Sequence, residues 1–225
     1  MVITEAQITS FNKYLNVTTG REKACRLVQY FARFYAFYLF RTGASKETIQ
    51  RWVNLKTHLG IGRKFFRLLK PVELAQSSIK SLGLSDPVLR STQTIKFTCN
   101  FFYYTSEAMN LFDTIKFYKL QDPKRVTEFG QKCWLIALTA SVISSLYQLK
   151  QIQIRSQKSV SDKEGASKLT KEKDATCYQL TQDLVDMLIP LGGLKWLNLD
   201  EGIIGIAGMV TSAMAMKSQW KKTNP

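Results

Sequence analysis

Apolar residues recur at intervals of three and four along most of this chain, and this spacing restricts the possible folds more than any other feature of the sequence. Ile8, Phe11 and Leu15 begin the pattern, and the run from Leu27 to Phe40 repeats it. Such spacing places apolar side chains on one face of an α-helix, whereas a half-buried strand alternates apolar and polar residues. No convincing alternation occurs in the 225 residues. The sequence therefore predicts an all-α fold.

Several helix boundaries can be predicted from local signals. Thr19, followed three residues later by Glu22, matches a capping box, so a second helix is expected to open there and to end before Gly43. Ser45 is expected to cap a third helix. Pro123 and the aspartate before it mark another helix start, because a proline in the first turn loses no hydrogen bond.

The charge of the chain is strongly positive and unevenly distributed. Thirty-two Lys and Arg oppose 17 Asp and Glu, which gives a formal net charge of +15. Residues 1–90 alone contain 15 basic and 5 acidic side chains. A basic region of this kind favours an anionic partner, and the candidates are anionic lipid and nucleic acid. We therefore expect residues 1–90 to be a basic N-terminal helical region that binds such a partner.

One segment of this region, residues 55–72, separates into an apolar and a cationic face when it is placed on a helix. The expected cationic face consists of Lys56, Arg63, Lys64, Arg67 and Lys70, and the expected apolar face of Leu59, Ile61, Phe65, Phe66, Leu68 and Leu69. No acid occurs between Glu47 and Glu73. This separation is typical of a helix that lies in a membrane surface.

Two observations favour a membrane helix at 56–70 over a core helix with a solvated basic face. A solvated face normally mixes both signs of charge, because opposite charges one turn apart stabilise a helix. Gly60 and Gly62 each cost about 1 kcal/mol in a helix interior, so the segment needs a partner. Anionic lipid supplies about 1 kcal/mol per surface cation and an apolar phase for the opposite face. Nucleic acid would use the same cations but has no need of the apolar face.

Three further regions follow residue 90. We expect an aromatic-rich helical region at 91–149, a charged flexible linker at 150–174 and an apolar helical region at 175–225. Uncharged runs at 133–149 and 202–216 are candidate membrane spans. The first is 17 residues long, about 25 Å as a helix, which is the low end of what crosses a bilayer. The sequence thus predicts a membrane-associated protein with one or two short spans.

The first candidate span has a stripe of small polar residues. Ser141, Ser144, Ser145 and Gln148 share one side of the expected helix. Such a stripe suits close helix packing within a membrane. It equally suits the wet side of a helix that lies on the membrane surface, so both arrangements remain open at this point.

The sequence lacks the residue combinations that most enzymes need. His58 is the single histidine, which excludes histidine-based triads and sites with several histidine ligands. No phosphate-binding glycine loop is present. We therefore expect no enzymatic activity, no catalytic residues, no metal site and no cofactor.

Three stretches together resemble the peroxin eleven family of peroxisomal membrane proteins, and its fungal members are the most similar. The first stretch contains Gly20, Arg21, Glu22, Lys23, Arg26, Leu27, Gln29, Tyr30 and Arg33. The second runs from Gly62 to Lys70, and the third is the glycine-rich run 202–216 followed by Trp220. The resemblance covers nearly the whole chain. Pro71 departs from the family pattern and is expected to end or kink the basic helix early.

The resemblance implies a location and a function. It implies a peroxisomal membrane protein that elongates and tubulates the membrane before peroxisome division, and thereby promotes proliferation. Its amphipathic helix, Lys56–Lys70 here, would insert into one leaflet of an anionic phospholipid membrane. The implied partners are further copies of the chain and a dynamin-like fission GTPase with its adaptors. The alternatives are a metabolite pore built from residues near 91–149 and 184–216, and a soluble nucleic-acid-binding protein, although we expect no nucleic acid partner.

Overall fold

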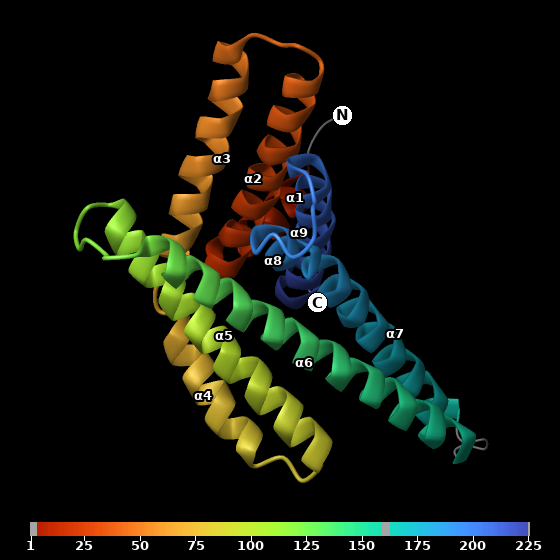
Figure 1. Ribbon diagram of the computed structural model, residues 1–225. Helices are drawn as coiled ribbons and strands as arrows, with labels where there is room; N and C mark the ends of the chain where they lie inside the picture. The colour runs from red at the N-terminus through yellow and green to blue at the C-terminus, as the bar shows by residue number, and fades with distance from the viewer. Residues whose placement is uncertain (1–3, 159–162, 225) are drawn as a thin grey trace.

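The structure, a computed structural model, describes residues 4–158 and 163–224, and every regular element in these ranges is a helix (Figure 1). In chain order they are α1 (Glu5–Asn16), α2 (Thr18–Arg41), α3 (Lys46–Phe66), α4 (Lys70–Leu82), α5 (Pro87–Thr114), α6 (Pro123–Lys158), α7 (Lys163–Asp186), α8 (Leu188–Gly193) and α9 (Glu201–Thr223). The all-α prediction is confirmed for the described residues.

The helices form three antiparallel hairpins that extend in different directions from a common centre (Figure 1). The α2–α3 hairpin points to the top of the view, α4–α5 to the bottom and α6–α7 to the lower right. α9 packs along α2, and α5 packs along α6 as far as the tip of the α4–α5 hairpin, where the Tyr147 hydroxyl of α6 donates to Asp86 at 2.8 Å. α3 and α4 follow one another along the same side of the molecule. This centre positions the candidate site.

Local signals predicted some helix starts correctly and one incorrectly. The side chain of Ser45 accepts the Thr48 N–H at the start of α3, and α6 begins at Pro123, so both predictions are confirmed. The capping box at Thr19 is wrong, because α2 already begins at Thr18 without a side-chain cap. Glu22 instead forms an ion pair with Arg63 of α3.

Compared with a soluble bundle, the polarity of the molecule is partly reversed, although a small apolar cluster also lies around Tyr30, Ile189 and Ile204. Buried polar residues include Glu22, Arg26, Arg63, Ser141, Ser144, Asp183, Asp186, Thr211 and Ser212. Exposed apolar residues include Phe31, Phe40, Phe65, Leu69, Ile79, Phe129, Ile136, Ile143, Ile203, Ile206 and Val210. Buried polar groups together with large exposed apolar surface indicate an apolar environment around the protein.

Helix α6 illustrates this reversal. Its exposed side chains include Phe129, Ile136 and Ile143, which are seven residues apart. Ser141, Ser144 and Ser145 are buried, and the Ser141 hydroxyl donates to Asp183 of α7 at 2.6 Å. The serine stripe is therefore a packing surface, and the alternative that it forms the wet side of the helix is wrong.

Helix α9 packs closely against α2 through its glycines. A Cβ at Gly205 would lie 2.9 Å from the backbone nitrogen of Phe34, and one at Gly208 would lie 2.1 Å from the Tyr30 ring. Only a residue without a side chain permits this approach of α9 to α2. Ile203 lies outside this contact and is exposed.

By length and composition, one helix of the described residues qualifies as a membrane span, Pro123–Gln157. It contains the candidate span 133–149. Residues 202–216 belong to α9, which does not meet the same criterion, so the structure does not support the second candidate span.

The charged segment 150–174 differs from the flexible linker that its composition predicted. Its first part continues α6 to Lys158, and its last part belongs to α7, which begins at Lys163. Residues 159–162 lie outside the described residues. Arg155 donates to Glu172 across the hairpin at 2.8 Å. Pairing between the two helices orders a segment whose composition alone indicates disorder.

Candidate functional site

The basic segment is not one continuous helix. α3 ends at Phe66, Arg67 is its C-cap with φ −110°, and α4 begins at Lys70. The short stretch 67–69 between them is called the α3–α4 junction below. Pro71 explains the break, because in an unbroken helix its ring would clash with the Arg67 carbonyl and it has no N–H to donate. The predicted helix 56–70 is therefore corrected, and the early end expected from Pro71 is confirmed.

The cationic side of this segment faces the interior, which corrects the predicted exposed cationic face. The Arg63 guanidinium donates to the Glu22 carboxylate, with Nε to Oε1 at 2.8 Å. The two side chains are 8% and 4% exposed. Arg63 also donates to Gln29 Oε1 at 2.5 Å. Arg63 therefore joins α3 to α2 and is not available to a lipid surface in this conformation.

Three other cations of the same side are also in ion pairs. Arg67 donates to Glu107 of α5 at 3.0 Å and stacks over the Tyr104 ring, 5.4 Å from its centroid. Lys56 lies 3.3 Å from Glu201 of α9, and Lys70 pairs with Glu73. The fifth, Lys64, lines the cavity at the centre of the molecule. The acids that the segment itself lacks come mainly from other helices.

The electrostatics around Glu22 show how tightly this centre is organised. Burial alone would raise the pKa of the Glu22 carboxyl, but the neighbouring cations Lys23, Arg63 and Arg67 outweigh it and hold the pKa at about 2. Glu22 is therefore ionised at neutral pH and serves as a permanent counter-charge for three cations.

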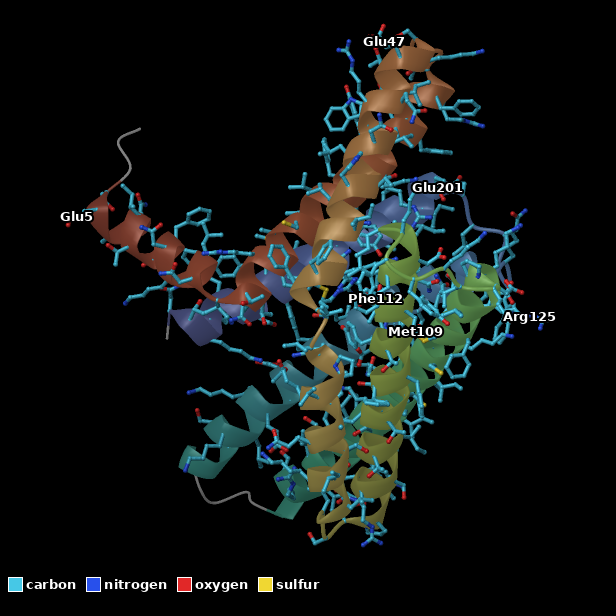
Figure 2. All side chains as sticks on the ribbon, turned by 90° about the vertical axis from the view of Figure 1, so that its left-hand side faces the viewer. Glu5, Glu47, Met109, Phe112, Arg125 and Glu201 are labelled. Carbon is cyan, nitrogen blue, oxygen red and sulfur yellow. The ribbon has the colours of Figure 1, made fainter. Side chains whose placement is uncertain are left out.

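The apolar side of the segment faces outward. Phe65, Phe66 and Leu69 are 50%, 43% and 75% exposed, and Leu59, Ile61 and Leu68 are partly exposed. Figure 2 shows α3 with Glu47 at its upper end and α4 below it along the same side of the molecule. The wheel therefore separated the two faces correctly, but it did not predict that the cationic face packs against other helices of the chain.

The three stretches that carry the family resemblance meet around α2. Gly20 packs against the Tyr14 carbonyl, Lys23 lies 3.1 Å from Glu22, and Arg21 donates to the Leu15 carbonyl at 2.6 Å. Arg26 pairs with Asp186 of α7 at 2.5 Å, Arg33 pairs with Glu201 of α9 at 2.6 Å, and Tyr30 packs against Gly208. The motif residues thus hold α2 to its neighbours, whereas Leu27 is only partly buried.

Sequence reasoning missed the acids that complete these pairs. They are Glu107, Asp186 and Glu201, from α5, α7 and α9. The available signal was an isolated acid within an otherwise apolar helical segment, most clearly Glu107. Such an acid requires a buried partner, because an unpaired buried charge is strongly destabilising.

Comparison with known proteins assigns this chain to a family. The family model described as "Peroxisomal biogenesis factor 11 (PEX11)" matches residues 8–220. Peroxisomal biogenesis factor 11 of Schizosaccharomyces pombe is 27% identical over 220 residues, covering 92% of both chains.

Further fungal relatives match over almost their full length. Peroxisomal membrane protein PMP30B of Candida boidinii is 28% identical, and peroxisomal membrane protein PMP27 of Saccharomyces cerevisiae is 27% identical. Each match covers 96% of this chain and 95% of the relative. No solved structure matches the chain. The match over nearly the whole chain shows that this protein belongs to the PEX11 family of peroxisomal biogenesis factors and has a role in peroxisome biogenesis.

Proposed function

We propose that this protein elongates the peroxisomal membrane before division by burying the outward apolar side of residues 59–69 in one leaflet. Family membership gives the role in peroxisome biogenesis and points to a biogenesis factor rather than an enzyme. The fungal relatives named above as peroxisomal membrane proteins support the location.

The observation that carries the proposal is the exposure of Phe65, Phe66 and Leu69 beside a charged interior. Full burial of such a side chain stabilises by about 1.5–3 kcal/mol, so three half-exposed ones contribute several kcal/mol when they enter lipid. Bulk inserted into one leaflet pushes headgroups apart on that side only, which favours positive curvature. This is the geometry that elongation of a membrane requires.

The cations have a different role from the one that the wheel suggested. Arg63 and Arg67 fix the α3–α4 junction to α2 and α5 through Glu22 and Glu107. They hold the apolar side in position, and attraction to anionic phospholipid becomes the smaller contribution. The same ion pairs argue against nucleic acid as the partner, because paired guanidinium groups are poorly available to phosphates.

One inserted segment strains little bilayer, so we propose that many copies of the chain act together. By resemblance to the family, a dynamin-like fission GTPase with its adaptors would then divide the elongated organelle. Further copies of the chain and the fission GTPase are therefore the two partners that we propose.

The experiment is liposome flotation and tubulation with the full-length double variant Phe65→Glu, Leu69→Glu. Two carboxylates on this surface should abolish insertion because each charge resists transfer into lipid. We expect loss of flotation and of tubules, and few, enlarged peroxisomes in cells that carry the variant.

Two matched controls test whether the loss of membrane binding depends on the apolar character and on the position of the changed residues. Phe65→Leu with Leu69→Met keeps the apolar side and should bind as the native protein does. Ile8→Glu with Phe11→Glu places the same charges on exposed positions of α1 and should bind far better than the junction variant. Normal tubulation by Phe65→Glu, Leu69→Glu would contradict the proposal.

A further inference from the structure

A polar cavity of about 430 Å³ lies where the three hairpins meet, between α2, α3, α5, α6 and α7. Its volume is within the range of small-molecule binding sites. Seven Lys and Arg line it against three carboxylates. These cations are Lys23, Arg26, Arg33, Arg63, Lys64, Arg67 and Lys96.

The wall contains more positive charge than its own acids balance. The arginines are paired, Arg26 with Asp186, Arg63 with Glu22 and Arg67 with Glu107. Among the described residues, Lys64 and Lys96 have no carboxylate within ion-pair distance.

Other polar and charged side chains of the same wall act on Lys64 and Lys96. Lys96 donates to the Ser141 hydroxyl at 2.8 Å. Burial lowers the pKa of both lysines by more than the nearby carboxylates, Glu107 for Lys64 and Asp183 for Lys96, raise it. Ammonium groups whose charge is only partly compensated are costly to bury, so an anion in this cavity would be stabilised.

A second observation concerns an acceptor. The Oε1 atom of Gln131 is buried in the same wall and has no hydrogen-bond donor among the described residues. A buried acceptor of this kind is normally satisfied, and a simple anion offers it nothing. This oxygen lies beside Gly193 of α8, and when the side chain turns into the cavity a ligand with hydroxyl groups would donate to it. The wall therefore combines cations for an anionic group with an acceptor for a hydroxyl.

We propose that this cavity binds a phosphate ester that carries hydroxyl groups, with Lys64 and Lys96 as its principal charge partners. Ammonium groups are effective phosphate ligands, whereas the planar forks of the arginines are already occupied by carboxylates. The same chemistry is present in a free polyol phosphate and in the headgroup of an inositol lipid. This site does not depend on membrane insertion by the α3–α4 junction.

The test is thermal unfolding of the full-length protein in neutral phosphatidylcholine nanodiscs, followed by fluorescence of its four tryptophans. One arm titrates myo-inositol 1-phosphate, and a second replaces part of the lipid with phosphatidylinositol. Free myo-inositol and sodium chloride of equal ionic strength are the control titrations. Binding to the folded state raises the midpoint in a saturable manner.

Saturable stabilisation by inositol phosphate alone identifies a free ligand, and stabilisation by phosphatidylinositol alone identifies a lipid headgroup. Either result supports the proposal. No shift in both arms, or an equal shift with sodium chloride, would overturn it.

Lys64→Gln with Lys96→Gln leaves the arginine–carboxylate pairs in place and should weaken binding by at least about tenfold, since hydrogen bonds to charged groups contribute roughly 1.5–3 kcal/mol each. The matched control, Lys119→Gln with Lys124→Gln, removes two exposed lysines outside the cavity and should bind normally. Equal affinity in both variants would also overturn the proposal. If the cavity variant fails to fold, the titrations of the native protein still decide.

Discussion

The pair between Arg63 and Glu22 links residues 41 positions apart and is almost completely buried. A helical wheel assigns each side chain to a face but contains no information about which face the rest of the chain covers. Lipid and a carboxylate-rich helix surface satisfy the same cations, so the sequence of residues 55–72 fits both. Only the position of Glu22, fixed by α2, distinguishes them.

Removal of one partner of this pair should therefore destabilise the protein strongly. Arg63→Ala leaves the Glu22 carboxylate buried, and we expect a loss of about 3–5 kcal/mol. Arg51→Ala is the control, because Arg51 and Glu47 form an exposed pair with side chains 74% and 78% accessible and should lose less than about 1 kcal/mol. Denaturant unfolding in detergent measures both. Equal losses in the two variants would show that the buried pair does not hold the junction.

At the scale of elements, the sequence predicted what local chemistry determines. The starts of α3 and α6 follow from Ser45 and Pro123, and the break before α4 follows from Pro71. Contacts distant in sequence explain the failures. Glu22 accepts a hydrogen bond from Arg63 of α3 and does not cap α2. The segment 150–174 is ordered by the pairing of α6 with α7.

The α3–α4 junction provides the prediction at this scale. In the native chain the amides of Leu68, Lys70 and Val72 donate to carbonyls three residues earlier. Pro71→Ala removes the clash with the Arg67 carbonyl and restores an N–H, so α3 should continue into α4. Amide hydrogen exchange at residues 68–70 should slow by about tenfold or more, since a proline inside a helix costs about 3 kcal/mol.

The control for this prediction is Pro87→Ala. Pro87 begins α5 directly after the Asp86 cap, where a proline costs nothing, so exchange there should change little. Unchanged exchange at residues 68–70 in Pro71→Ala would mean that the ion pairs of Arg63 and Arg67, and not the proline, determine the break.

The whole molecule has ion pairs at its centre and large apolar side chains on its surface. The motif on α2, the basic segment and the glycine-rich α9 meet in that centre, which explains why three distant stretches together carry the family resemblance. The sequence could predict the helices and the apolar faces, because both depend on periodicity. It could not predict the centre, because the acids that complete it come from α5, α7 and α9. The metabolite pore formed by residues near 91–149 and 184–216 stays a prediction.

The central claim is that the apolar side of the α3–α4 junction faces lipid. Its most direct test is a nitroxide spin label at position 65 or 69 of a cysteine-free protein in anionic vesicles, with Phe65→Cys, Leu69→Cys and the exposed control Lys124→Cys compared. We predict that labels at 65 and 69 collide with dissolved oxygen and are shielded from a water-soluble nickel complex, whereas the label at 124 collides with the nickel complex. Equal access of the nickel complex to all three labels would contradict the account.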